Sequence, residues 1–154
     1  MRLVAATLCA LASLVATYSN AAQVFSCDGA EVRIEVVARE SPMWEERAEA
    51  VVTVSRAGEV TTLRYRNIDF IGGQCFVKNR SQSLVIFQAF CGGSGCKDLD
   101  NWGVVDPETL RVLTVPSDTN REQALALIGG SVLPRLGLMN VLAEARKQGI
   151  DVPD

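Results

Sequence analysis

Four cysteines constrain the possible folds of this chain more than any other feature, and they are Cys27, Cys75, Cys91 and Cys96. In an exported protein four cysteines predict two disulfides, for which three pairings are possible. The favoured pairing joins Cys27 to Cys75 and leaves the last two cysteines to each other, because three glycines and a serine lie between them and bend tightly. A four-cysteine zinc site is the alternative, although the spacing lacks two CxxC pairs.

The start of the chain, residues 1–21, has the pattern of an export signal. Arg2 supplies one positive charge, the stretch after it is apolar but too short to span a bilayer, and small residues precede Ala21. We expect signal peptidase to cleave after Ala21 or the next residue, which removes Cys9 with the signal. Residues 22–154 are then expected to form a single disulfide-braced domain without a transmembrane anchor, in the periplasm or outside the cell.

The composition of the chain excludes several classes of function. It has no histidine, which rules out Ser-His-Asp and Cys-His catalytic systems and histidine-based metal sites. Its formal net charge is −3, and removal of Arg2 with the signal makes it −4, so a nucleic-acid backbone is not an expected partner. We expect no metal and no cofactor. The mature length of about 130 residues predicts one hydrophobic core.

Most of the chain, residues 24–115, shows the alternation and the β-branched residues that are typical of strands. Ala57 and Gly58 separate two such runs and predict a hairpin, and residues 106–108 predict a turn near the end of the region. We expect an antiparallel β meander or a small barrel of about seven strands. The expected strands are 32–36, 50–54, 60–65, 74–78, 84–90, 103–105 and 110–115.

After Pro116 the apolar pattern takes a helical period. Residues 119–122 fit a capping box, and the short apolar stretch that follows ends at a pair of glycines. A second helix is expected over 134–148, with Leu138, Val141, Leu142 and Ala145 turned toward the core and Gly149 as its cap. Strands followed by two C-terminal helices make the expected fold class α+β.

The most specific local feature is the short loop between Cys91 and Cys96, which contains Gly93, Ser94 and Gly95. A disulfide would hold this loop rigid, so that Ser94 and the backbone amides could bind a partner with little loss of conformational entropy. A braced turn between two strands is an equally good interpretation. A redox-active pair is a further alternative, which the spacing of four residues disfavours.

Two other segments are candidates for function. The segment 39–49 is acidic and predicts an exposed loop, in which Trp44 is either a contact residue for a partner or part of a solvated connection. Farther along, Asp98, Asp100 and Gly103 match three positions of a calcium-binding loop, but the remaining positions do not match. The two aspartates could also form an acid/base pair for glycoside cleavage, or simply cap a turn, which is the favoured interpretation.

The sequence also resembles a known family over residues 24–96. The start Phe-Ser-Cys-Asp-Gly at 25–29, an alternating strand, a hairpin over 51–62 and a Gly-Ser loop are similar to the periplasmic C-type lysozyme inhibitors. The resemblance implies an eight-stranded barrel and a loop of the type Ser-Gly-x-Gly-x-x-Tyr that enters the lysozyme cleft and contacts its catalytic carboxylates. The nearest equivalents are 93–95, which lacks the tyrosine, and 71–74, which lacks the serine.

These observations together favour a non-enzymatic periplasmic binding protein with a protein partner, such as an inhibitor of an envelope-directed hydrolase, either a lysozyme or a toxin. The hypothesis depends on the absence of histidine, of an evident nucleophile and of a metal-binding motif. One alternative is a carbohydrate-active enzyme that uses Asp98 and Asp100, which a deep cleft lined by both carboxylates would favour. The other is a structural or assembly factor of the envelope, which a large exposed apolar patch would favour.

Overall fold

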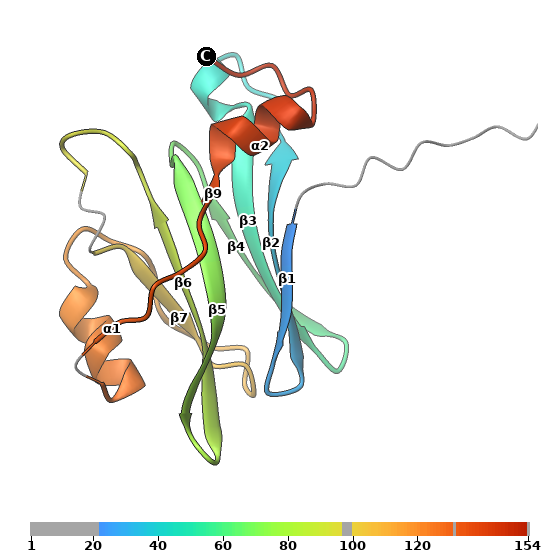
Figure 1. The fold of residues 1–154 in the computed structure, drawn as a ribbon. Coiled ribbons are helices and arrows are strands. Elements are labelled where there is room, and N and C mark those ends of the chain that lie inside the picture. Colours follow the sequence, from blue (N-terminus) through green and yellow to red (C-terminus); the bar gives the residue numbers. More distant parts are fainter. Residues whose placement is uncertain (1–21, 97–99, 131, 154) are drawn as a thin grey trace, which may run out of the picture.

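The computed structural model describes residues 22–96, 100–130 and 132–153, and it shows two β-sheets with two short helices (Figure 1). The expected signal segment 1–21 lies outside the described residues. The elements in chain order are β1 (Ala22–Cys27), β2 (Ala30–Ala38), the 3-10 helix η1 (Trp44–Glu46), β3 (Ala48–Arg56), β4 (Glu59–Tyr65), β5 (Phe70–Asn79), β6 (Gln82–Phe90), β7 (Trp102–Val105), β8 (Val112–Thr114), α1 (Arg121–Ile128), β9 (Met139–Asn140) and α2 (Val141–Lys147).

The strands form two antiparallel sheets, ordered β1-β2-β3-β4 and β8-β7-β6-β5-β9. The expected α+β class and the antiparallel meander are confirmed, and each of the seven expected strands overlaps an observed one. The strand count of about seven is wrong, because β1 and β9 make nine in the described residues. The barrel alternative is also wrong, because the two sheets remain separate and open.

The main core lies between the two sheets. On β2, Val32, Ile34 and Val36 alternate with polar residues and point inward, as one face of a half-exposed antiparallel strand should. Phe87 of β6 fills the middle of the second sheet, and an added Cβ on Gly103 would overlap its ring. Gly103 is therefore required by packing in β7. This gives a structural reason for a glycine that had suggested a calcium loop.

A second core covers the other face of the second sheet. Leu84 and Ile86 of β6 point away from the first sheet and pack with Trp102 and Val104 under α1. Figure 1 shows this sheet between the first sheet and α1. Because β6 is buried on both faces, its sequence is nearly continuously apolar rather than alternating.

The C-terminal part differs from the expectation of a helix over 134–148. Helix α2 begins only at Val141, where the side chain of Asn140 accepts a hydrogen bond from the Ala143 amide at 2.8 Å. The preceding residues run along β5, and an added Cβ on Gly72 would overlap the Gly137 carbonyl. Val141 and Ala145 are buried as expected, but Leu142 is only half-buried and Leu138 is 40% exposed.

The start of α1 also corrects an expectation. The predicted capping box at 119–122 is wrong, because the Asn120 side chain makes no cap hydrogen bond and instead binds the backbone of Trp102. The predicted end is confirmed, since Gly129 adopts the left-handed conformation with φ of 66° and its amide donates to Ala126 and Leu125.

The two disulfides join the cysteines in the favoured pairing. Cys27 at the end of β1 is bonded to Cys75 of β5, with Cα atoms 5.1 Å apart, so this bridge ties the first sheet to the second. Cys91 is bonded to Cys96 across the short glycine loop, with Cα atoms 5.7 Å apart. Both separations lie in the range that disulfides require.

The outer face of the first sheet carries a buried carboxylate. Glu49 is 5% exposed and accepts hydrogen bonds from Arg64 at 2.7 Å and from Arg66 at 3.2 Å. Burial by itself raises the pKa of Glu49, but the hydrogen bonds and charges of the two arginines outweigh it and lower this pKa from its ordinary 4.5.

This carboxylate is expected to contribute to acid sensitivity. A lowered pKa in the folded state means that Glu49 stabilises the fold above its unfolded pKa and loses that contribution as the pH falls through the folded pKa. Glu49→Gln should therefore lower the melting temperature at neutral pH and flatten its decline below pH 4.5. Thermal melts across this range test it, with the exposed Glu59→Gln as control. Parallel curves for wild type and Glu49→Gln would contradict the prediction.

Candidate functional site

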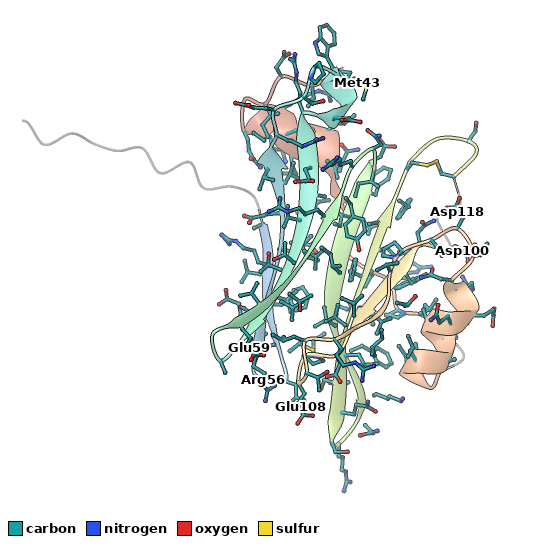
Figure 2. The ribbon with its side chains drawn as sticks, turned by 180° about the vertical axis from the view of Figure 1, so that it is seen from behind. Met43, Arg56, Glu59, Asp100, Glu108 and Asp118 are labelled. Atoms are coloured by element: carbon teal, nitrogen blue, oxygen red, sulfur yellow. A yellow bond between two sulfur atoms is a disulfide. The ribbon has the colours of Figure 1, made fainter. Side chains whose placement is uncertain are left out.

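One end of the sandwich gathers the longer connections between strands. In an antiparallel meander alternate connections lie at the same end, so the segments 39–47, 66–69 and 91–96 all lie at one end, which we call the loop end. At the other end, strands are joined by the short turns 28–29 and 57–58. Figure 2 shows Met43 at the loop end and Arg56, Glu59 and Glu108 at the opposite end. Loops on a rigid scaffold are common binding sites.

The first hollow at the loop end is a pocket of about 380 Å³, which we call the apolar pocket. Its walls come from the segments 39–47 and 66–69, from the start of α2 and from the C-terminal tail. Its apolar lining is Met43, Ile68, Leu142 and Pro153, and its polar lining is Glu46, Asn67 and Asp69.

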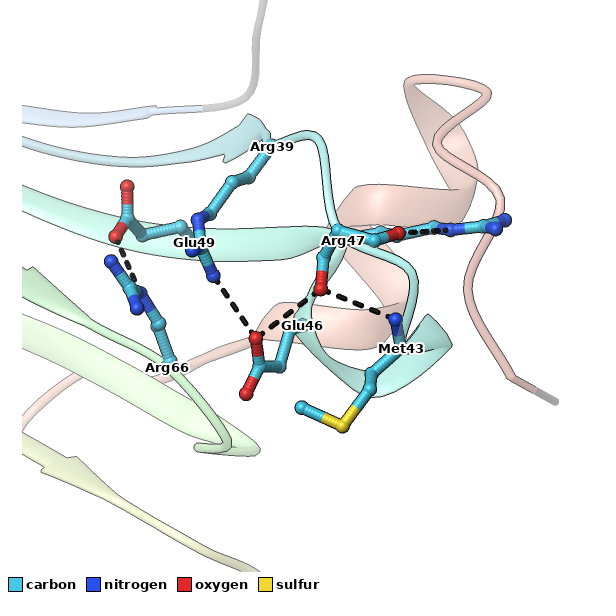
Figure 3. Close-up of polar contacts among 7 residues, drawn as sticks. Arg39, Met43, Glu46, Arg47, Glu49 and Arg66 are labelled. Carbon is cyan, nitrogen blue, oxygen red and sulfur yellow. Dashed lines mark hydrogen bonds and ion pairs between the residues drawn. The ribbon is translucent and has the colours of Figure 1, made fainter.

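The segment 39–47 is held in place by polar contacts that surround its carboxylate (Figure 3). The Glu46 side chain accepts a hydrogen bond from Arg39 at 3.1 Å and another from the Ser41 hydroxyl at 3.2 Å. Arg47 donates to the Ser41 carbonyl at 3.2 Å and forms an ion pair with Asp151. The segment is therefore held by hydrogen bonds between its own residues and by an ion pair with the C-terminal tail.

This anchored segment presents two large apolar side chains to solvent. Met43 is 53% exposed and borders the apolar pocket, and Trp44, the first residue of η1, is 57% exposed. The prediction that 39–49 is an exposed loop is confirmed around Met43 and Trp44 but wrong at its end, because Ala48 and Glu49 are buried in β3. Trp and Met are enriched at protein interfaces, where their large contact area contributes binding energy.

Asp69 lies at the junction of three chain segments. Its backbone amide donates to Phe90 at 3.0 Å, its carbonyl accepts from Val141 at 2.8 Å, and its carboxylate accepts from the Gly92 amide at 2.5 Å. Unlike Glu46, it has no lysine or arginine at ion-pairing distance among the described residues. The apolar pocket thus has one carboxylate with a cationic partner and one without.

The second hollow, which we call the loop pocket, lies under the Cys91–Cys96 bridge and has a volume of about 300 Å³. Its base is formed by Phe70 and Phe90, whose ring centroids are 5.5 Å apart. An added Cβ on Gly92 would lie 2.8 Å from the Phe70 ring, so the loop packs closely on this base. Because Asp69 lines one pocket and Phe70 the other, the two hollows are neighbours.

The structure places every candidate partner-binding residue at the loop end. Gly93, Ser94 and Gly95 are exposed, and Ser94 lines the loop pocket. Trp44 lies on a different connection of the same end. Asp69 and Leu142 were not among the expected site residues, because Asp69 stands in no motif and the helical pattern placed Leu142 in the core.

The catalytic alternative can be followed at only one of its two aspartates. Asp98 lies outside the described residues, and Asp100 is half-buried, with its backbone carbonyl accepting from the Gln88 side chain at 3.0 Å. Neither pocket is lined by Asp100. Within the described ranges no group of three or more cysteines and acidic residues could hold a metal ion, and no helix there is long and apolar enough to cross a membrane.

Two further groups with shifted pKa values also lie away from the pockets. Burial raises the pKa of Tyr65, so its hydroxyl stays protonated. Burial by itself raises the pKa of Asp106, but hydrogen bonds from Thr109 and Glu108 outweigh it and lower this pKa, as expected for a turn-capping aspartate. Neither residue lines the apolar pocket or the loop pocket, and both shifts are explained by burial and by local hydrogen bonds.

No protein-family model matches the chain, and no curated protein and no solved structure shows significant similarity to it. The resemblance to lysozyme inhibitors therefore stays a prediction, and function has to be inferred from the geometry of the loop end.

Proposed function

We propose that this protein is an exported, non-enzymatic binding protein that recognises a protein partner through the loop end. The observation that carries the proposal is the arrangement at this end: two adjacent hollows, flanked by the exposed Met43 and Trp44 on one side and by the disulfide-braced glycine loop on the other. Both flanking segments are anchored, so little conformational entropy would be lost when a partner binds.

The partner class that fits best is a hydrolase directed at the cell envelope, such as a lysozyme or a toxin, with the periplasm as the place of action. This part of the proposal is supported by the Gly-Ser loop, which is the nearest equivalent of the inhibitory loop in the family that the sequence resembles, although it lacks the tyrosine. The disulfides support an oxidising compartment. Purified lysozymes with and without the protein provide an assay for this narrower proposal.

Substitutions in the glycine loop test the proposed surface. An added Cβ meets nothing within 4 Å at Gly95 and only Cys96 Sγ at 3.7 Å at Gly93, and both positions are exposed, so a tryptophan side chain can extend into solvent from either. Gly95→Trp should therefore leave the melting temperature unchanged and abolish binding of the partner captured from an envelope extract. Ser94→Ala should weaken binding several-fold, since one neutral hydrogen bond contributes about 0.5–1.5 kcal/mol.

Arg80→Trp is the matched control, because it adds the same side chain to an exposed turn at the opposite end. It should bind the captured protein as tightly as wild type does. If Gly93→Trp, Gly95→Trp and Ser94→Ala all bind with unchanged affinity, the glycine loop is only a braced turn and this part of the proposal is wrong.

A further inference from the structure

The cationic side chains near the apolar pocket are already engaged. Arg39 pairs with Glu46, and Arg47 pairs with Asp151. On the adjoining face of the first sheet, Glu49 takes both Arg64 and Arg66. Asp69 is left as a pocket-lining carboxylate without a cationic partner among the described residues.

Within the part of the chain that the structure describes, the Asp69 carboxylate makes one hydrogen bond to another part of the protein, and it does so through a single oxygen atom. Its Oδ2 atom accepts from the Gly92 amide, and this bond fixes the orientation of the carboxylate between the two pockets. Each carboxylate oxygen can accept more than one hydrogen bond, so the group can also accept hydrogen bonds from a ligand. The carboxylate is half-buried, which reduces screening of its charge by water.

The rest of the lining defines the complementary chemistry. Met43, Ile68 and Leu142 provide apolar walls, and Asn67 adds an amide close to Asp69 in the chain. A lysine or arginine side chain has an apolar stem and a cationic head, and it buries the stem along apolar surface while the head meets polar groups. An aliphatic side chain would leave the carboxylate unpaired, and an acidic one would be repelled by it.

We propose that the apolar pocket receives a lysine or arginine side chain from the protein partner, and that its cationic head pairs with Asp69. This inference deepens the proposed function, on which it rests, by giving the chemistry of the partner's anchoring residue. Met43, which borders the pocket and is 53% exposed, then covers the stem from the solvent side. The net negative charge of the chain favours approach of such a basic surface.

Peptide binding tests the pocket without the unidentified partner. The probes are acetylated, amidated pentapeptides of four glycines around a central lysine, arginine, glutamine or leucine, titrated into the isotope-labelled protein while its amide NMR signals are followed. The lysine or the arginine peptide should cause saturable shifts at Ile68, Asp69 and Leu142, and these should weaken with added salt. Tighter or equal binding of the glutamine or leucine peptide, or no saturable shift with any peptide, would overturn the proposal.

A substitution that removes the charge of Asp69 but keeps the fold tests whether this carboxylate binds the basic side chain. Asp69→Asn retains an oxygen that can accept from the Gly92 amide, so the melting temperature should stay within a few degrees of wild type. Its affinity for the basic peptides should fall about tenfold or more, the scale expected for losing a charged hydrogen-bond partner. Glu108→Gln removes the same charge at the opposite end and should bind like wild type (Figure 2). Equal affinities of Asp69→Asn and wild type would refute the assignment.

Different results would refute the proposed binding function of the loop end and the proposed basic anchor at Asp69. If the captured partner binds wild type and Asp69→Asn equally well, the loop end remains the binding surface but the basic anchor is refuted. If the basic peptides bind at Asp69 and no protein partner is held through the loop end, the pocket assignment stands and the proposed function is wrong.

Discussion

Replacing Asn120 with alanine is expected to lower the free energy of unfolding by about 2–5 kcal/mol, because it removes a side chain that makes four hydrogen bonds, three of them buried. The Asn120 side chain accepts from the Trp102 amide at 2.9 Å and donates to the Trp102 carbonyl, to Val115 O at 2.7 Å and to Thr114 Oγ1 at 3.2 Å. It thus joins β7, β8 and the start of α1. Each buried group that is left unsatisfied costs about 1–3 kcal/mol.

Urea denaturation measures this loss, and Asn140→Ala is the matched control. Asn140 is exposed and its side chain accepts one hydrogen bond, from the Ala143 amide at the start of α2. Loss of such a helix cap costs about 1 kcal/mol. Similar losses for the two variants would contradict the view that Asn120 organises the second core.

The second large effect is expected from removal of the bridge between the sheets. Cys27 and Cys75 are 48 residues apart, whereas Cys91 and Cys96 are five apart. On the loop-entropy model the long bridge stabilises the fold by about 4 kcal/mol and the short one by about 2 kcal/mol. Burial of Cys27 in the main core adds a packing loss when its sulfur is removed.

The measurement compares two double variants in guanidinium melts. Replacing Cys27 and Cys75 with alanine should shift the midpoint more than replacing Cys91 and Cys96. Equal shifts, or a larger shift for the short bridge, would show that the bridge between the sheets is not the main covalent support of the sandwich.

The fold could be predicted where short-range patterns determine it. The alternation along β2 and the glycine turn at 57–58 depend only on residues close together in the sequence. They therefore predict the correct strands. The late start of α2 depends on contacts distant in sequence, above all the passage of Gly137 over Gly72. The 119–122 motif misled for the same reason, because the Asn120 side chain serves a strand 18 residues away. Long-range partners of this kind leave no periodic signal.

The candidate site was predictable only in part. Trp44 and Ser94 stand out as an exposed aromatic in an acidic loop and as a serine between glycines, and both lie at the loop end. Trp44 and Ser94 lie at the same end because of the order of the strands, which neither motif reveals. The apolar pocket needs Pro153 of the C-terminal tail to lie beside Met43 and Ile68, and only the three-dimensional fold brings these residues together.

Hydrogen exchange of the protein, free and bound to its captured partner, maps the contact surface without substitutions and so shows whether the loop end holds the partner. We expect binding to slow exchange in the segments 39–47, 66–69 and 91–96 and to leave exchange in the turns 28–29 and 57–58 unchanged. Protection confined to those turns or to the outer face of the first sheet, with unchanged exchange at the loop end, would contradict it.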